Sequence, residues 1–242
     1  MKLLAVIPAR GGSKRIKRKN IKSFHGKPII AYTLETLNHS GIADKVHVST
    51  EDEEIYNVVA ECGFKPDFFR PAELAEDDTP TLPVLRHSLE MFADESYDAV
   101  LLINPCSVLV ESRDLVDAYQ NFKKTRPKIL MAVARFPAPV EWAFDMGEDG
   151  RIKPRQPNML EKPSQEFSEA VYDTGTFAFL SSDYVLSELG AGSFTGMSAF
   201  EIDRRKAVDI DTLDDWNYAE FLYTATQKGT NSLGNVHGNT VS

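Results

Sequence analysis

Cysteine is scarce in this sequence, which holds Cys62 and Cys106 among its 242 residues. Two cysteines at this separation do not form the paired spacing of a metal-binding motif. Long hydrophobic runs are missing too, because no apolar stretch approaches the roughly 18–20 residues of a membrane span. The apolar segment at residues 3–7 is short and is followed by cations, which is not typical of a secretory signal peptide. We therefore expect a cytoplasmic protein with reduced cysteines and no association with membranes.

Acidic residues are missing before Glu35, although the whole chain has a formal net charge of −9. This acidic balance argues against general binding of nucleic acid or of anionic membranes. The acid-free segment instead concentrates basic residues, namely Arg10, Lys14, Arg15, Lys17, Arg18, Lys19, Lys22 and Lys27. We call residues 9–22 the basic loop. A local group of cations on an acidic protein indicates a site for a small anionic ligand.

Apolar patterning predicts alternating strands and helices over about 135 residues. Continuous apolar runs predict buried strands, and apolar residues in helical phase predict helices between them. The expected strands are 2–7, 46–50, 68–71, 99–103, 130–134, 170–180 and 206–211; the expected helices begin near 29, 53, 80 and 112, with a helix near 182–189 and a last one from 212. This alternation predicts an α/β fold with a mostly parallel sheet and helices on both faces.

The alternation stops at residues 137–170, which are rich in proline and charge. An Asp149-Gly150 pair predicts a β-hairpin within this segment. A segment of this length inside a compact domain has two interpretations, a surface loop or a dimerisation arm. We expect one domain over 1–227 that carries this insertion. Residues 228–242 are rich in Gly, Asn, Ser and Thr, so we expect a flexible C-terminal tail there.

Gly11 and Gly12 follow the first predicted strand and precede most of the cations. Glycine lets backbone N–H groups approach anionic oxygens, so a strand, a glycine turn and cations together indicate a polyphosphate site. The segment matches neither Gly-x4-Gly-Lys-Ser/Thr nor Gly-x-Gly-x-x-Gly, and a solvated basic stretch is the alternative. Thr50, Arg70 and Asn104 also follow predicted strands. Because ligands bind outside the carboxyl ends of parallel strands, we expect these residues to share one crevice with the basic loop.

Asp209 and Asp211 are the second candidate feature. Residues i and i+2 of a strand point to the same side, so a strand at 206–211 would bring both carboxylates together. Two such carboxylates repel each other unless a cation lies between them. A small number of oxygen ligands suits Mg²⁺, which completes its coordination with substrate phosphates. The alternative is an acid cluster at the start of the last helix, where Asp214 and Asp215 favour the helix dipole.

Three segments together resemble a known family: IPARGGSKRIKRKNI at 7–21, RPAELAEDDTPT at 70–81 and DIDTLDDWNYAE at 209–220. They are similar to segments of the CMP-sialic acid synthetase family, the cytidylyltransferases that activate nonulosonic acids. The resemblance covers about residues 1–225 and implies a Rossmann-like nucleotidyltransferase fold with an inserted dimerisation arm. It also implies Mg²⁺, a homodimer, and two substrates, CTP and an acidic nine-carbon keto sugar.

The resemblance implies roles for individual residues as well. Arg10, Lys19 and Asp211 are expected to act in catalysis. Asp209 and Asp211 are expected to bind the metal. CTP is expected to contact Ala9, Arg10, Gly11, Gly12, Ser13, Lys19, Asn20, Arg70 and Asn104. The sugar is expected to contact Arg155, Asp173, Gly175 and Thr176.

Within this family, the segments 24–28 and 172–177 favour the branch that activates pseudaminic acid. Thr174 and Thr176 stand where that branch usually has Ala and Gln. The segment 104–110 lacks the arginine that the sialic-acid branch carries after its central strand, which disfavours N-acetylneuraminate. N-acetylneuraminate, legionaminate and Kdo stay open as alternative substrates. A non-catalytic nucleotide-binding regulatory protein is the alternative of another class.

Overall fold

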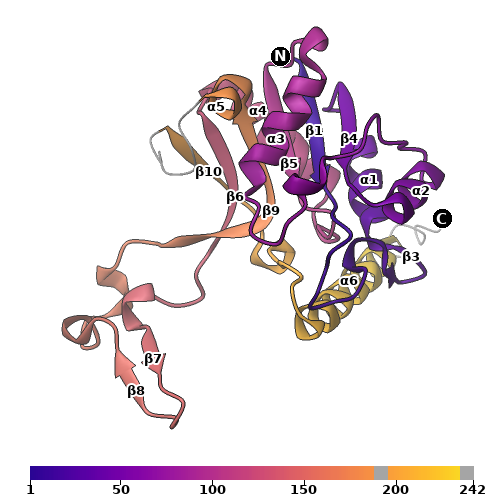
Figure 1. Cartoon of the computed structure of the whole chain (residues 1–242). Helices are drawn as coiled ribbons and strands as arrows, with labels where there is room; N and C mark the ends of the chain where they lie inside the picture. The colour runs from indigo at the N-terminus through magenta and orange to yellow at the C-terminus, as the bar shows by residue number, and fades with distance from the viewer. Residues whose placement is uncertain (188–195, 235–242) are drawn as a thin grey trace, which may run out of the picture.

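A six-stranded sheet forms the centre of the molecule in this computed structural model, which describes residues 1–187 and 196–234 (Figure 1). The strand order is β10-β6-β9-β5-β1-β4. Their bounds are β1 Leu3–Pro8, β4 Lys45–Ser49, β5 Ala99–Ile103, β6 Ile129–Arg135, β9 Val171–Ser181 and β10 Met197–Glu201. β9 runs antiparallel to both of its neighbours, and the other strand pairs are parallel. The predicted mostly parallel α/β sheet is therefore confirmed.

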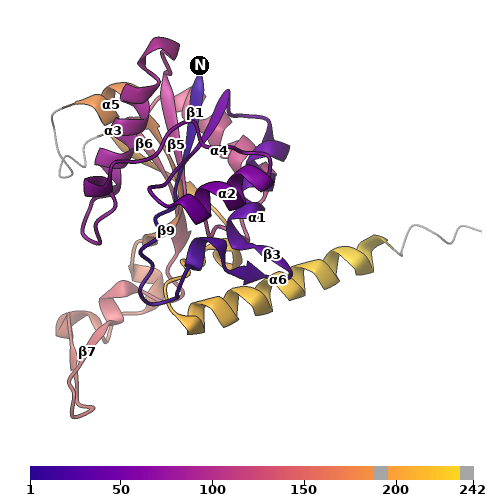
Figure 2. The same ribbon diagram turned by 45° about the vertical axis from the view of Figure 1, so that its right-hand side comes forward.

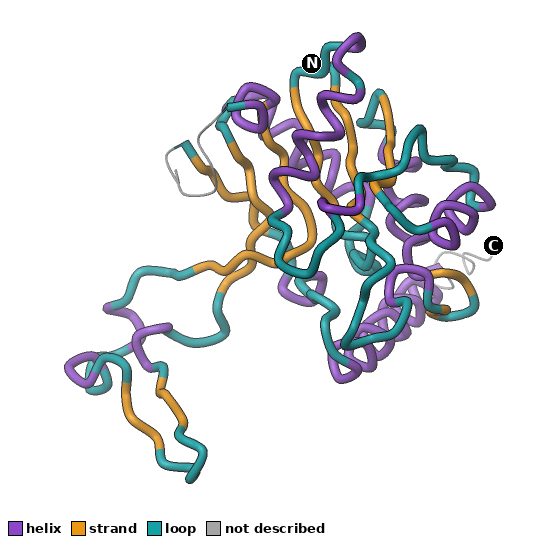
Figure 3. Tube along the Cα trace, viewed as in Figure 1, coloured by secondary structure: helices purple, strands orange, loops and turns teal. Residues whose placement is uncertain are grey.

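Helices cover both faces of this sheet, as the three-layer arrangement in Figure 3 shows. Their bounds are α1 Ile29–Ser40, α2 Glu53–Glu61, α3 Thr81–Met91, α4 Ser112–Thr125, α5 Ser182–Leu186 and α6 Leu213–Gly234. Side chains of β1 alternate between the faces: Leu3 and Ile7 join a core with α1, α2 and α4, whereas Leu4 and Val6 join a core with α3 and α5. Burial on both faces explains why β1 is continuously apolar.

Helix ends lie where the sequence places them. The Asp52 side chain accepts a hydrogen bond from the N–H of Ile55 at 3.0 Å and so caps α2. Gly41 ends α1 with a φ of 61°, a left-handed conformation that glycine adopts without strain. The predicted helix near 182–189 is α5, and residues 188 and 189 lie outside the described residues.

Two of the expected strands are not formed. Residues 68–71 lie in a loop, although the Arg70 N–H still donates to the Thr50 carbonyl at 2.8 Å. Residues 206–211 form no strand either, because Ile210 packs in a cluster with Trp216 of α6 rather than against the sheet. The last strand is instead β10 at the edge of the sheet. Each of its residues is exposed or half-buried, without regular alternation, so its hydrophobic pattern is too weak to predict.

Helix α6 packs on the start of α1 and on a small hairpin that precedes it, made of β2 Ser23–Phe24 and β3 Lys27–Pro28. Phe24 is fully buried there, and its ring contacts those of Trp216 and Tyr223. Figure 2 shows that α6 then extends past the body of the domain. Residues 228–234, expected in a flexible tail, continue α6, and residues 235–242 lie outside the described residues.

The insertion at 137–170 projects away from the sheet as an arm (Figures 1 and 2). It contains the predicted hairpin, with β7 Phe144–Met146 paired to β8 Ile152–Pro154. Gly150 has a φ of 76° in the turn between them. Short 3₁₀ helices complete the chain, at Lys19–Ile21, Ala72–Leu74, Ala93–Glu95, Val140–Trp142, Pro157–Met159, Ser164–Glu166 and Arg204–Lys206. Among the described residues, none of the helices has the length and apolar character that crossing a bilayer requires.

Candidate active site

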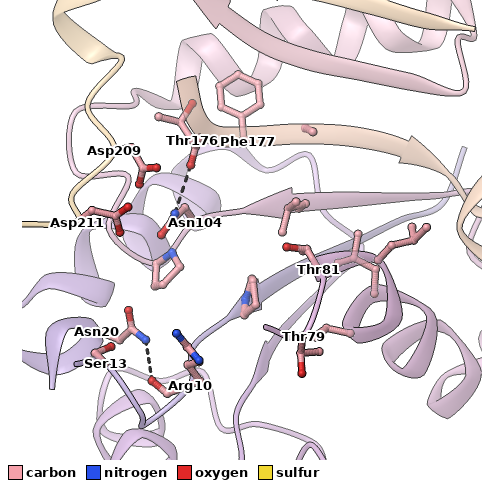
Figure 4. A pocket seen from close by; sticks show the side chains of 18 of the residues that line it. Arg10, Ser13, Asn20, Thr79, Thr81, Asn104, Thr176, Phe177, Asp209 and Asp211 are labelled. Atoms are coloured by element: carbon pink, nitrogen blue, oxygen red, sulfur yellow. Dashed lines mark hydrogen bonds between the residues drawn. The ribbon is translucent and has the colours of Figure 1, made fainter. Parts of the chain in front are cut away.

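A cavity of about 610 Å³ lies beyond the carboxyl ends of β1 and β5. Figure 4 shows Arg10, Ser13 and Asn20 on one side and Asp209 and Asp211 across from them. The predicted site residues that line it are Arg10, Ser13, Lys19, Asn20, Arg70, Asn104, Asp173, Gly175, Thr176, Asp209 and Asp211. Segments that are distant in the sequence therefore meet in one crevice, as the order of strands predicts. Thr50, expected in the same crevice, does not line it.

Four cations of the cavity wall share two carboxylates. Arg10 donates from Nη1 to Oδ1 of Asp77 at 2.7 Å, and Lys14 pairs with the same carboxylate. Arg15 lies 2.8 Å from Oδ2 of Asp211, whose Oδ1 lies 3.3 Å from Nζ of Lys19. Two positive charges are left uncompensated in this group. The whole lining holds five cations and five carboxylates, so it is this cluster of cations, rather than the net charge of the wall, that offers a place for an anionic group.

Backbone N–H groups of the basic loop are engaged elsewhere. Ala9 donates to the Ser49 carbonyl at 2.9 Å, and Ser13 donates to the Gly11 carbonyl at 3.0 Å. The Gly11 N–H donates to Oε1 of Glu51 at 2.7 Å. Ala9, Gly11 and Gly12 do not line the cavity. The N–H groups of Ala9, Gly11 and Ser13 are thus held by protein acceptors in this structure, and the groups of the basic loop that line the cavity are side chains.

Glycine at position 11 has a packing reason. A Cβ built there would collide with the carboxylate of Asp52. That carboxylate accepts hydrogen bonds from both Nη atoms of Arg18, at 2.6 and 2.8 Å. These bonds hold the pKa of Asp52 well below its usual range, at about 2. Only glycine lets the basic loop pass this close to the start of α2.

Asn20 and Asn104 occupy opposite parts of the cavity wall. Asn20 is buried and donates from Nδ2 to the Arg10 carbonyl at 3.0 Å. The Asn104 amide bridges backbone groups: Nδ2 donates to the Gly175 carbonyl at 3.3 Å, and Oδ1 accepts from the Cys106 N–H at 3.2 Å. Asn104 therefore ties the end of β5 to β9, and its amide is the first polar group beyond the sheet.

A bulge in β9 forms the floor of the cavity. The pairing of β6 with β9 shifts register between Met131 and Val133, and residues 174–177 of β9 lie at this shift. Gly175 has a φ of 64° in the bulge, and a Cβ built there would lie 2.9 Å from Oδ2 of Asp209. Bulges commonly re-aim side chains beside active sites. Here the bulge lets the chain at 209 approach the floor of the cavity.

Asp209 and Asp211 face the cavity from the loop before α6, not from a strand as predicted. Burial raises the pKa of Asp209, and the charge of Asp211 adds to the effect. Asp215 is separate from this pair, because its carboxylate accepts the N–H groups of Asp211 and Thr212 at 3.1 and 2.7 Å. Asp215 thus stabilises the start of α6, which is the role that the sequence predicts for the acidic residues at this helix terminus.

The donor set of this pair is compatible with a hard cation. Among residues 1–187 and 196–234, no group of three or more His, Cys, Asp or Glu side chains is arranged as a metal site. Two carboxylates alone leave most of a coordination shell open. Mg²⁺ typically accepts one or two carboxylates and completes its shell with water and substrate phosphates, so Asp209 and Asp211 fit this ion.

Arg155 lies apart from the other predicted site residues. It is on the arm, does not line the cavity, and pairs through Nε with Oδ1 of Asp145 at 2.7 Å. The structure in turn places Lys14 and Arg15 of the predicted cation group on the cavity wall, and it adds Asp77, Thr79 and Thr81, which the sequence did not assign to the site. The signal for three of these was present in the segment DDTPT, because it precedes a predicted helix at the same edge of the sheet.

The chain is similar to known cytidylyltransferases over most of its length. The model of the cytidylyltransferase family matches residues 4–183. The pseudaminic acid cytidylyltransferase of Campylobacter jejuni is 34% identical over 231 residues, which cover 92% of this chain and 97% of that protein. The CMP-N,N'-diacetyllegionaminic acid synthase of Legionella pneumophila is 28% identical over 232 residues, with 94% and 99% covered.

A solved structure shares the fold. CMP:2-keto-3-deoxy-manno-octonic acid synthetase complexed with CTP superimposes with a TM-score of 0.71, over 93% of this chain and 100% of that chain. The sequence identity is 16%, so this likeness concerns the fold alone.

Proposed function

Since this chain belongs to the cytidylyltransferase family, we propose that it activates a nonulosonic acid, pseudaminic acid, with CTP to give the CMP-sugar and pyrophosphate. The chain is an enzyme of the CMP-nonulosonate synthetase type. One observation carries the proposal: a cluster of cations and a pair of carboxylates line the same cavity, and Asp211 contacts two of the cations. The first suits a triphosphate, and the second suits the metal-assisted attack of a hydroxyl group.

The reaction joins the anomeric oxygen of the sugar to the α-phosphorus of CTP. The bond from that phosphorus to the β-phosphate oxygen breaks, pyrophosphate leaves, and the hydroxyl proton is lost to solvent. Negative charge grows on the phosphoryl oxygens and on the leaving group, so positioning and electrostatic stabilisation carry most of the catalysis. Arg10 and Lys19 hold the triphosphate, while Ser13 and Asn20 are placed to donate hydrogen bonds to it.

Arg70 and Asn104 bound the nucleoside part of the cavity in this proposal. Arg70 is almost fully buried, and its guanidinium is held by Glu51. Ala9, Gly11 and Gly12 contribute the shape of the basic loop rather than direct contacts, because they lie outside the cavity wall.

Asp209 and Asp211 are proposed to hold Mg²⁺ together with oxygens of the substrates. When bound, the ion lowers the pKa of a coordinated hydroxyl and neutralises phosphate charge. In this proposal residues 209–211 lie beside the sugar. Asp211 also holds Arg15 and Lys19 beside the phosphates.

The sugar is proposed to lie against the bulge in β9, beside Asp173, Gly175 and Thr176. Arg155 can pair with the sugar carboxylate only if the arm brings it to a cavity. The arm exposes Phe144, Met146 and Ile152, and exposed apolar side chains of this size favour contact with another surface. We propose that the arm packs on a second copy of the chain, in a cytoplasmic homodimer.

The test is turnover of purified protein with CTP, Mg²⁺ and a panel of nonulosonic acids. Pyrophosphate release and the mass of the CMP-sugar are measured for pseudaminic acid, legionaminic acid, N-acetylneuraminic acid and Kdo. We expect the highest kcat/KM with pseudaminic acid. Preference for another acid would reassign the substrate, whereas binding of CTP in calorimetry without turnover of any acid would favour a regulatory protein.

A further inference from the structure

Glu51 links the basic loop to Arg70 although it does not line the cavity. It follows β4 and stands two residues before α2. Its Oε1 accepts the Gly11 N–H at 2.7 Å, and its Oε2 accepts Nη2 of Arg70 at 2.8 Å. The side chain of Glu51 is 22% exposed and that of Arg70 is 4% exposed. One half-buried carboxylate therefore joins two segments that both contribute to the cavity wall.

Asp52, the next residue, holds the far end of the same loop. It binds both Nη atoms of Arg18 and caps α2 through the Ile55 N–H. Arg18 itself has a φ of 56°, so the loop turns sharply at this anchor. Glu51 and Asp52 together hold the loop at both ends, with the cations Lys14 and Arg15 between the anchors.

The physical need for these anchors is electrostatic. The cations of the basic loop repel one another, and an unrestrained loop would spread them into solvent. A buried guanidinium such as that of Arg70 is costly unless it has a charged partner. Among the described residues, Glu51 is the partner in the ion pair of Arg70, whose Nε makes no hydrogen bond.

From these contacts we propose that Glu51 is a positioning residue for CTP. It places the Gly11 segment and Arg70 in the geometry that receives the triphosphate, without touching the nucleotide itself. The proposal rests on the proposed function, because it assigns the cavity to CTP. Hydrogen bonds to charged groups of this kind correspond to changes of about ten- to a hundredfold when one partner loses its charge.

The test compares Glu51→Gln with Glu53→Gln. Both substitutions remove one negative charge near the start of α2, but Glu53 is exposed and serves as the matched control. The amide introduced by Glu51→Gln keeps an acceptor for Gly11 and presents an N–H group to Arg70, which already donates. We expect the KM for CTP to rise about tenfold or more in Glu51→Gln, with the KM for the sugar unchanged. Glu53→Gln should match the wild type.

Two further measurements separate positioning from loss of folding. Amide hydrogen exchange at Gly11 should accelerate in Glu51→Gln, because a neutral amide oxygen is a weaker acceptor than a carboxylate. Protection in β1 and β5 should stay the same. Glu51→Asp keeps the charge and shortens the reach, so its KM for CTP should lie between those of the wild type and Glu51→Gln. If Glu51→Gln does not fold, the proposal is tested by Glu51→Asp alone, whose KM for CTP should be higher than that of the wild type.

A KM for CTP that is unchanged or lower in Glu51→Gln and in Glu51→Asp would overturn the proposal. A lower value would indicate that Glu51 occupies a place which phosphate takes in the complex. Failure of the proposed function looks different, because the wild type would then release no pyrophosphate with any acid. In that case the Kd for CTP, measured by calorimetry in the same variants, still tests the positioning role.

Discussion

Nζ of Lys19 lies 3.3 Å from Oδ1 of Asp211 and also donates to the carbonyl of Ile210. This contact joins the basic loop to a segment 192 residues further along the chain. A cation for the phosphates and a carboxylate for the metal thus restrain each other. Changes at either position are expected to act on both halves of the site.

Lys19→Ala tests the triphosphate half. Losing one charged donor that faces developing charge typically lowers kcat about 10²–10³-fold. Pyrophosphate release at saturating CTP measures this loss. Lys17→Ala is the matched control, because Lys17 is exposed and does not line the cavity. Turnover of Lys19→Ala near that of the wild type would remove Lys19 from the mechanism.

Asp211→Asn tests the metal half. Removing one of two carboxylates should suppress magnesium-dependent turnover about 10³-fold, because a bound cation stabilises transition-state charge by several kcal/mol. Binding of Mn²⁺ in the presence of CTP, followed by electron paramagnetic resonance, should weaken in parallel. Asp214→Asn alters an exposed carboxylate and should behave like the wild type. Full activity of Asp211→Asn would contradict the metal assignment.

Gly175→Ala tests the approach of Asp209 to the bulge. The substitution places a Cβ 2.9 Å from Oδ2 of Asp209 and also strains a φ of 64°. Gly41→Ala is matched, because Gly41 at the end of α1 has a φ of 61° with none of the described residues near its Cβ position. Both variants should lose about 1–2 kcal/mol of unfolding free energy in denaturant titrations. Only Gly175→Ala should also lose turnover, and equal activities would show that the contact with Asp209 has no role.

Because His47 is buried without a charge, we expect the free energy of unfolding to decrease in acid. Its ring is fully buried, stacks on Phe68 with 4.1 Å between ring centroids, and lies 3.6 Å from Asp67. Burial lowers the pKa of His47 from 6.5 to about 4. The unfolded chain therefore binds a proton between these values that the folded chain does not. The contribution of neutral His47 to the free energy of unfolding is fully present above pH 6.5. We expect it to decrease by about 3 kcal/mol as the pH decreases to 4.

The variant His47→Phe isolates this contribution. Phenylalanine keeps the ring between Phe68 and Phe92 and has no proton to bind. Its unfolding free energy, from denaturant titrations at several pH values, should fall less steeply between pH 6.5 and 4. His39→Gln alters an exposed histidine and should keep the slope of the wild type. Identical slopes for His47→Phe and the wild type would refute the assignment.

Most of the sheet could be predicted from the sequence because its central strands are buried on both faces. β1 and β5 are continuously apolar for that reason. β10 could not be found in this way, since it is an edge strand with much of its surface in solvent. Residues 208–211 alternate apolar and acidic residues as a strand would, but Val208 and Ile210 pack under α6, a contact that no strand period reveals.

The site was predictable where chemistry follows residue type. Asp209 and Asp211 stand out by charge and spacing, whereas the family resemblance selects Arg10 and Lys19 from the eight cations. The structure brings all four to one cavity. The partners of the backbone N–H groups in the basic loop were not predictable. The Gly11 N–H binds Glu51, which lies on another segment, and only the tertiary fold shows which acceptor is near. Arg155 lies on the arm, which projects away from the sheet. Its distance from the cavity therefore cannot be predicted from its position in the sequence.

Arg10 and Lys14 share the carboxylate of Asp77, so a phosphate that binds these two cations exchanges with an internal carboxylate. Asp77 is 46% exposed and can turn into water when it is displaced. Asp211 stays in place in the proposed complex, because it is assigned to the metal. If the cavity receives CTP as proposed, this exchange favours a triphosphate over a ligand with one phosphate, and Asp77 can return to Arg10 and Lys14 once pyrophosphate has left.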